Sequence, residues 1–168
     1  MEHLELARSG LDIRRWQGVG PPPPPGGMGP PCAQCGVSRW VELGGGEAGD
    51  VYHPNLDCYQ APGIDIVHDL ESGTLPFHDG HAERIKGIHF INHISYRAAR
   101  AILRECHRVL APGGSLYLMA SDTDFVLERI REDGLRPEWL VCLYHETDPS
   151  KGGFHRWAYS FATLRAEL

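Results

Sequence analysis

The chain has 168 residues, 42% of them hydrophobic, which suits one domain with a substantial core and no membrane-spanning segment. Its formal net charge of -6 gives no general attraction to a phosphate backbone, which argues against nucleic-acid binding as the main task. No apolar leader with a cleavage site follows Met1, so we expect a cytoplasmic location and no membrane partner.

The first 36 residues read as an N-terminal arm. A weak helical pattern runs from Met1 to about Gly18. It is followed by a Pro/Gly-rich run from Pro21 to Pro31, which predicts a polyproline linker that neither forms a helix nor pairs in a sheet. We therefore expect residues 1–36 to form an arm with a Pro/Gly-rich linker, and residues 37–168 to form the folded domain.

The five cysteines are an odd number, which favours reduced thiols over a disulfide framework. Cys32 and Cys35 have the spacing of half a zinc site, but no second close cysteine pair follows. A distant histidine could still complete a site. A lone pair at this spacing is a weak signal, however, and we expect no bound metal.

Beyond the arm, strand-like and helix-like runs alternate, which predicts an α/β fold. The expected strands cover residues 40–43, 55–58, 64–68, 85–91 and 115–120. The expected helices follow Ser95, span residues 123–133 and span residues 154–168, while 138–144 is ambiguous. Only about ten residues separate the first two strands, too few for a full crossover helix.

The segment after Ser95 is amphipathic, with arginines opposite an apolar stripe formed by Ala99, Leu103, Cys106 and Leu110. Ser95 suits the N-cap, and Pro112-Gly113-Gly114 is expected to close the helix. A strand on either side of this helix implies a right-handed parallel crossover.

In an open parallel sheet, ligands bind beyond the carboxyl ends of the strands. The candidate groups that follow the predicted strands are Gly44 to Gly46, Asp57, Asp69, Asn92, His93, Ser121 and Asp122. Glycines at a strand end let a ligand approach the backbone closely. Carboxylates there suit the hydroxyls and base of a nucleoside, so the pattern favours a nucleotide-like cofactor.

Several of these motifs, in this order, resemble class I S-adenosylmethionine-dependent methyltransferases, in particular the methyltransferase type 11-like group. The motifs are Glu42-Leu43-Gly44-Gly45-Gly46, Asn55-Leu56-Asp57, Gly63 to Leu70, Leu75-Pro76-Phe77, Ile88 to Ile94, Leu103 to Gly114 and His155 to Ser160. The resemblance spans about residues 40–168, and this group also has a short first loop.

The resemblance implies a Rossmann-like, doubly wound and mostly parallel sheet of about five strands. It also implies S-adenosylmethionine as cofactor. Members of the family continue into a C-terminal antiparallel strand pair, which this chain lacks, so it looks C-terminally shortened. The last strand would then expose an edge that a protein partner or self-association could cover.

The resemblance also implies which residues would bind each part of the cofactor. Gly44, Gly45 and Gly46, with Glu42 beneath them, would hold the methionine moiety. Asp57 would bind the ribose hydroxyls. Asp69 and Leu70 would face the adenine, and His89 is grouped with these cofactor-binding residues.

His93 is the candidate catalytic base, because it follows the fourth predicted strand and a histidine titrates near neutral pH. A histidine simply packed at a strand end is an equal alternative. Asn92 departs from the family, which usually has a carboxylate there. The sequence thus predicts a methyltransferase acting on an unidentified acceptor; the alternative is a non-catalytic methyltransferase-like binding or assembly module within a larger complex.

Overall fold

The computed structural model describes residues 27–47, 51–145 and 153–168. The predicted N-terminal helix and the proline run from Pro21 to Pro25 lie outside these residues. The strands are β1 (Gly27–Met28), β2 (Trp40–Leu43), β3 (Tyr52–His53), β4 (Asn55–Asp57), β5 (Ile66–Val67), β6 (Ala82–Ile88) and β7 (Leu110–Met119). The helices are η1 (Leu70–Ser72), α1 (Tyr96–Val109), α2 (Thr123–Asp133), α3 (Pro137–Tyr144) and α4 (Phe161–Glu167).

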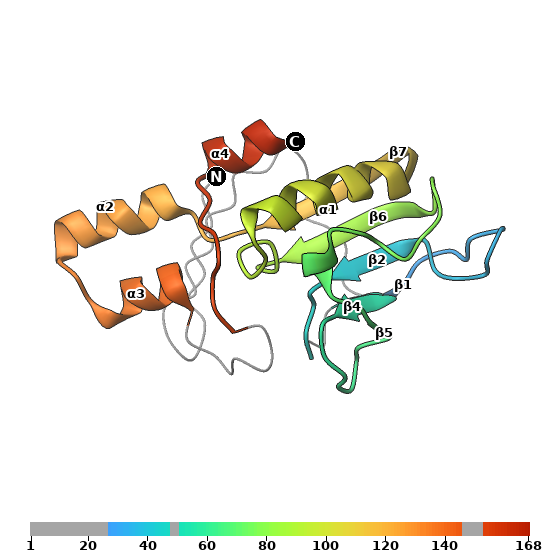
Figure 1. Cartoon of the computed structure of the whole chain (residues 1–168), viewed down its shortest axis with the longest axis horizontal. Coiled ribbons are helices and arrows are strands. Elements are labelled where there is room, and N and C mark those ends of the chain that lie inside the picture. The colour runs from blue at the N-terminus through green and yellow to red at the C-terminus, as the bar shows by residue number, and fades with distance from the viewer. Residues whose placement is uncertain (1–26, 48–50, 146–152) are drawn as a thin grey trace.

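The main sheet has five strands in the order β5-β4-β2-β6-β7, and every pairing in it is parallel. The first long strand, β2, lies at the centre (Figure 1). The chain first adds β4 and β5 on one side and then β6 and β7 on the other. This reversal of strand order is that of a doubly wound, Rossmann-like α/β fold, as the sequence predicts.

Strand boundaries differ from the prediction around the α1 crossover. α1 ends at Val109, where the Leu110 N–H donates to the Cys106 carbonyl. The following Ala111 to Gly114 run does not close the helix as predicted, because it already belongs to β7. A register shift between Ala82 and Arg84 accommodates the extra length.

The Pro/Gly-rich run pairs in a sheet after all. Gly27 and Met28 form β1, which pairs in parallel with Tyr52 and His53 of β3. The Gly27 N–H also donates to the Val51 carbonyl at 2.8 Å. Glycine and proline disfavour strands but do not forbid a short pairing at an edge, so this part of the expectation was wrong.

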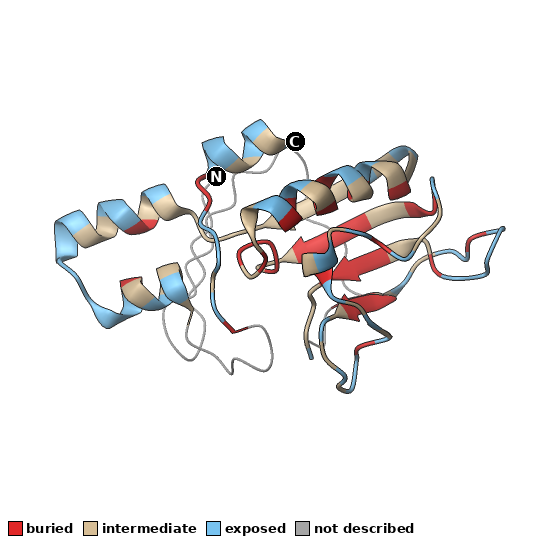
Figure 2. Cartoon of the chain, in the orientation of Figure 1, coloured by how far each residue is buried: buried red, intermediate tan, exposed pale blue. Residues whose placement is uncertain are grey.

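Helix α1 supplies the core with one face, as predicted. Ser95 caps it by accepting from the Ala98 N–H. Ala99 and Cys106 are fully buried, and Leu103 is nearly so. Figure 1 shows α1 lying along one face of the sheet, and Figure 2 shows its buried residues turned toward the strands.

The final predicted helix is only half formed. Residues 154–160 form no helix, and Tyr159 forms a parallel bridge with Asp122 beyond the end of β7. The helix α4 starts after Ser160, which forms a capping box with Thr163. Tertiary pairing therefore overrides helix propensity before this cap, and Tyr159 is buried while Trp157 is exposed.

Among the described residues, β7 pairs only with β6, and no antiparallel strand pair follows it. None of the helices in this part of the chain is long and apolar enough to cross a membrane.

Candidate functional site

The carboxyl ends of the five parallel strands form one edge of the sheet. The turn after β2 lies beside the segment after β6, at the point where the strand order reverses. The topology brings to this carboxyl edge the residues that the sequence predicts there, namely Gly44 to Gly46, Asp57, Asp69, His89, Asn92, His93 and Asp122.

The glycine run forms a tight turn that needs glycine. Gly44 and Gly46 have positive φ angles of 64° and 57°. A Cβ on Gly44 would lie 2.3 Å from the Cβ of Phe90, so the turn packs closely on the segment after β6. At Gly46 such a Cβ would be in ordinary van der Waals contact with the Tyr59 hydroxyl at 3.5 Å, so the turn is less crowded there.

Asp57 fixes this turn. Its Oδ2 accepts from the Gly46 N–H at 2.9 Å, and its Oδ1 accepts from the Cys58 N–H at 2.7 Å. Each carboxylate oxygen has a second lone pair. The carboxylate is therefore oriented by the backbone and still able to accept from two ligand hydroxyls.

Glu42 lies beneath the turn and is only 1% exposed. It forms an ion pair with the buried Lys86 ammonium at 3.1 Å and accepts from the Tyr52 N–H at 3.0 Å. Two charges removed from water in this way are tolerated because they are paired and hydrogen-bonded. Glu42 thus positions the strand end and the segment around β3.

The two residues that the resemblance assigns to the adenine differ in exposure. Asp69 is exposed and caps η1, its Oδ1 accepting from the Glu71 N–H at 2.9 Å. Leu70 packs into the hydrophobic core, which leaves its backbone as the part nearest the edge. Glu71 accepts from the Ser95 N–H and pairs with Arg156 at 3.3 Å, which links η1 to the C-terminal segment.

Three histidines meet at this edge. The rings of His93 and His155 are 4.9 Å apart between centroids, and those of His145 and His155 are stacked at 5.2 Å. Burial, followed by the charges of the neighbouring histidines, lowers the pKa of His155 to about 4. His155 is therefore neutral at pH 7, and its Nδ1–H donates to the Leu143 carbonyl.

Two histidines at this edge have an unusual backbone. Within the described part of the chain, His89 and His145 are the only non-glycine residues with positive φ, at 60° and 49°. Such conformations cost about 1–3 kcal/mol and cluster at functional sites. The turn after β6 is thus held in a strained form beside the glycine turn.

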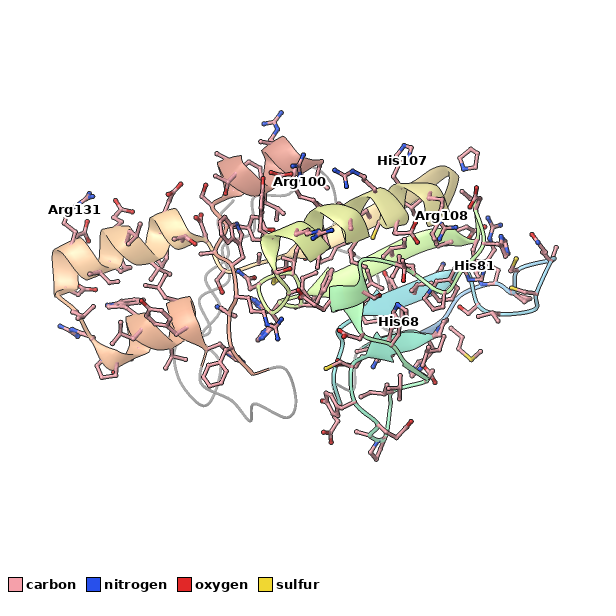
Figure 3. All side chains as sticks on the ribbon, in the orientation of Figure 1. His68, His81, Arg100, His107, Arg108 and Arg131 are labelled. Carbon is pink, nitrogen blue, oxygen red and sulfur yellow. The ribbon has the colours of Figure 1, made fainter. Side chains whose placement is uncertain are left out.

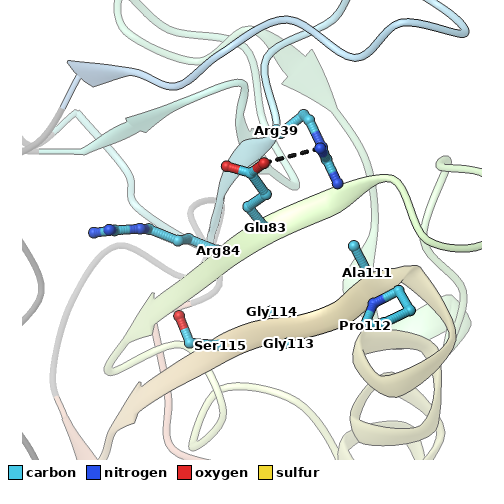
Figure 4. A pocket seen from close by; sticks show the side chains of 8 residues that line it. All are labelled: Arg39, Glu83, Arg84, Ala111, Pro112, Gly113, Gly114 and Ser115. Carbon is cyan, nitrogen blue, oxygen red and sulfur yellow. Dashed lines mark ion pairs between the residues drawn. The ribbon is translucent and has the colours of Figure 1, made fainter.

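Two grooves lie away from this edge. One of about 430 Å³ lies at the amino ends of β6 and β7, where Arg39 pairs with Glu83 at 2.8 Å (Figure 4). The other, of about 380 Å³, lies between α1, β7 and α4. Neither is lined by a residue assigned to the cofactor.

A second polar cluster lies at the amino ends of the strands and combines Cys32, Cys35, His78 and His81. The Cys32 Sγ is 3.3 Å from the His78 Nε2, and the Cys35 Sγ is 3.7 Å from the His81 Nδ1. Hydrogen bonds from the backbone of Gln34 and Cys35 lower the pKa of the Cys32 thiol to about 6. Figure 3 labels His81 near the start of β6.

The histidine half of this cluster was not predicted from the sequence. The partner of the cysteine pair is no second cysteine pair but His78-x-x-His81, which has the same spacing as Cys32-x-x-Cys35. A search for any close pair of metal-ligating residues would have found it.

Residues 49–118 match the family model described as a methyltransferase domain. This segment is similar to that family, in agreement with the resemblance to class I S-adenosylmethionine-dependent methyltransferases that the motifs carry. It contains Asp57, Asp69, His89 and His93, whereas the glycine turn lies just before it.

No curated protein sequence matches the chain. Among solved structures, the chain is similar to one titled a complex between the Haloferax volcanii Trm112 methyltransferase activator and the putative methyltransferase, with 17% identity and a TM-score of 0.46. The match covers 76% of this chain and 57% of that one, so the chain spans little more than half of that protein. It is also similar to a DhpI-SAM-HEP complex, with 17% identity, a TM-score of 0.49, and coverage of 85% and 68%.

Proposed function

We propose that the carboxyl edge of the sheet binds S-adenosylmethionine and that the protein transfers the cofactor's methyl group to an acceptor. The observation that carries this proposal is the Gly46–Asp57 contact. It places an oriented carboxylate beside a glycine turn, at the strand-order reversal of a chain whose residues 49–118 match a methyltransferase domain.

The residues present fit the cofactor. Asp57 offers two oriented oxygens to vicinal ribose hydroxyls, and such charge-assisted hydrogen bonds are the strong ones. Gly46 is less crowded than Gly44, because a Cβ there would meet only the Tyr59 hydroxyl, at 3.5 Å. Asp69 and the Leu70 backbone follow β5, two strands away from β2, where the adenine would extend.

The bound cofactor supplies an electrophilic methyl group on a sulfonium. The protein's part is to align the acceptor with that methyl group and to exclude water. His93 is the proposed base for an acceptor that must lose a proton, since it lies among neighbouring imidazoles after β6. Glu42 acts as a positioning residue beneath the glycine turn.

A specific observation favours a second candidate, a non-catalytic methyltransferase-like module that binds a protein partner. All three N–H groups of the glycine turn already donate within the chain, to the Leu56 carbonyl, the Asn55 Oδ1 and the Asp57 Oδ2. They are thus committed to the turn itself. A partner, or a second copy of the chain, would then cover the edge of β7.

Titration of the full chain with S-adenosylmethionine and S-adenosylhomocysteine separates the two candidates. At about 100 times the dissociation constant, binding adds about 2.7 kcal/mol of stability. This should raise the melting temperature by about 5–10 °C for a domain of this size.

Asp57→Ala should weaken binding by at least about 100-fold, because it removes two charge-assisted hydrogen bonds worth about 1.5–3 kcal/mol each. Asp133→Ala, at the exposed end of α2, is the matched control and should bind normally. A well-folded wild-type protein that binds neither ligand would refute the cofactor proposal and support the second candidate.

A further inference from the structure

The cluster of Cys32, Cys35, His78 and His81 lies at the opposite end of the strands from the proposed cofactor site. Cys32 and Cys35 lie in the turn that precedes β2, and His78 and His81 lie in the loop that leads into β6. Residues 46 positions apart in the chain thus meet side by side. Their two sulfur and two nitrogen atoms lie within 4.8 Å of one another.

These separations are close to those of a tetrahedral metal site. Ligand atoms at about 2.0–2.3 Å from a central zinc ion lie about 3.3–3.8 Å apart at the corners of a tetrahedron. The two sulfur–nitrogen distances, 3.3 Å and 3.7 Å, already fall in that range. Small side-chain rotations would bring the remaining pairs to it.

Both imidazoles are oriented with the correct nitrogen inward. The His81 Nε2 lies 3.0 Å from the Ser38 carbonyl, so it carries the proton and leaves the Nδ1 lone pair facing Cys35. The His78 Nδ1 lies 2.9 Å from the Asp79 carbonyl, so its Nε2 lone pair faces Cys32. A hydrogen bond from the distal nitrogen to a carbonyl is the usual support of a metal-bound histidine.

The cysteine turn is also held in place by the backbone. The Gly36 N–H donates to the Cys32 carbonyl, and the Cys32 N–H donates to the Val37 carbonyl. Gly36 has a φ of 74°, so only a glycine turns the chain at this point without strain. Pro31 and Ser38 then form an antiparallel bridge that closes the turn.

We propose that Cys32, Cys35, His78 and His81 bind one zinc ion. Two sulfur and two imidazole ligands are a common set for structural zinc, and four protein ligands leave no open position for a substrate. On binding, two S–H bonds are replaced by two Zn–S bonds and two protons pass to solvent, with no change of oxidation state. Two thiolates balance the charge of Zn²⁺ in a place where Cys32 and His81 are buried.

The zinc ion would fasten the segment before β2 to the start of β6. The same contact region contains the Arg39 side chain, whose Nε donates to the His81 carbonyl at 3.1 Å. Because the ion lies far from the carboxyl edge, it acts on stability and not on methyl transfer. The zinc site and the cofactor site can therefore fail independently.

The test measures metal in the full chain purified without chelator and without a metal-affinity tag. Wild-type protein should contain about one zinc per chain, and Cys35→Ser and His78→Ala should lower this content at least tenfold. Cys58→Ser and His107→Ala, exposed residues outside the cluster, are matched controls that should keep the zinc. Replacement by Co²⁺ should produce the visible absorption of a tetrahedral site with thiolate ligands.

A rescue variant keeps the proposal falsifiable if a ligand variant folds poorly. His78→Cys preserves a four-ligand set that also binds zinc, so it should regain the metal that His78→Ala loses. If the four residues only pack against one another and bind no metal, His78→Ala and His78→Cys should have the same zinc content. Wild-type protein that holds no zinc after reduction and incubation with Zn²⁺, or that contains a Cys32–Cys35 disulfide instead, would overturn the proposal.

Discussion

The two ends of the sheet use their polar residues in different ways. At the carboxyl edge, each of the carboxylates of Asp57, Asp69 and Glu42 accepts a hydrogen bond from a nearby backbone N–H. At the amino end, the cysteine sulfurs and the inward histidine nitrogens face one another, and backbone carbonyls accept from the distal nitrogens of the two histidines. Carboxylates that bond to the backbone hold the turns of a binding site in place. Side chains whose sulfur and nitrogen atoms converge on one point can bind an ion between them.

This difference also explains what holds each end together. The carboxyl edge is fixed by buried charge and close packing, since Glu42 pairs with Lys86 and Gly44 packs on Phe90. The amino end contains a short irregular turn with little apolar burial around Cys35 and Gly36. We therefore expect substitutions at the carboxyl edge to cost stability directly, and those at the amino end to act through the metal.

The largest expected effect is at the buried ion pair. Lys86→Met should lower the free energy of unfolding by about 3–5 kcal/mol, because Glu42 keeps its charge in a buried position without the ammonium beside it. Urea denaturation measures this loss. The double variant Glu42→Gln with Lys86→Met should be more stable than Lys86→Met alone; equal stabilities would show that the pair does not hold the carboxyl edge.

The next largest loss of stability is expected at the glycine turn. Gly44→Ala places a methyl group 2.3 Å from the Phe90 Cβ and requires a positive φ. Overpacking and the left-handed conformation together should cost about 2–5 kcal/mol. Gly113→Ala is the matched control, because Gly113 also has a positive φ, of 80°, with open space around it. A similar melting temperature for both variants would mean that contact with Phe90 contributes nothing.

Acidification should test the histidines of the carboxyl edge. The pKa of His155 is lowered from 6.5 to about 4 in the folded protein. Between these values the unfolded chain binds more protons, so stability should be constant above about pH 6.5 and fall as the pH drops toward 4. The contribution is at most about 3 kcal/mol, since one pKa unit is worth about 1.4 kcal/mol and the ring is partly exposed.

Comparison with His155→Gln isolates this effect from other titrating groups. The variant should lose part of the pH dependence of the unfolding free energy between pH 6.5 and 4, while its stability at pH 8 changes less. If wild type and variant show parallel pH profiles, the low pKa of His155 is not realised in the folded protein.

The sequence predicts the carboxyl edge well for a physical reason. In a parallel sheet, residues that follow each strand must gather at one edge, so Asp57 and Asp69 could be placed from strand order alone. The buried ion pair of Glu42 and Lys86 could not be predicted from strand order, because this contact depends on the register of β2 and β6. The non-helical segment before Ser160 was also missed, since its pairing with Asp122 is a long-range contact that local helix propensity does not report.

The amino end could be predicted only in part. Residues that precede strands also gather at one edge, but the cysteine turn lies before β2 and its histidine partners lie before β6, with β2, β3, β4 and β5 between them in the chain. That β2 and β6 are neighbours follows from the doubly wound order. Combined with the matched spacing of the two pairs, this order would have brought Cys32 and His78 together.

The smallest loss of stability is expected for a change that loosens the loop containing His78. The Arg108 guanidinium donates to the carbonyls of Leu75 and Phe77 and to Asp79, and thus ties this loop to α1 (Figure 3). Arg108→Gln should cost about 1–2 kcal/mol, because Arg108 is partly exposed and each hydrogen bond contributes modestly. Arg104→Gln, exposed on the same helix, should cost less than about 0.5 kcal/mol.

Arg108→Gln also tests whether the two ends of the sheet bind their ligands independently. A loosened loop should weaken zinc binding, measured by competition with a chelator, and should leave the affinity for S-adenosylhomocysteine unchanged. The reverse outcome, weaker cofactor binding with unchanged zinc affinity, would contradict the division of the sheet into a metal-held amino end and a cofactor-shaped carboxyl edge. The loop before β6 would then belong functionally to the carboxyl edge, although it lies at the other end of the strands.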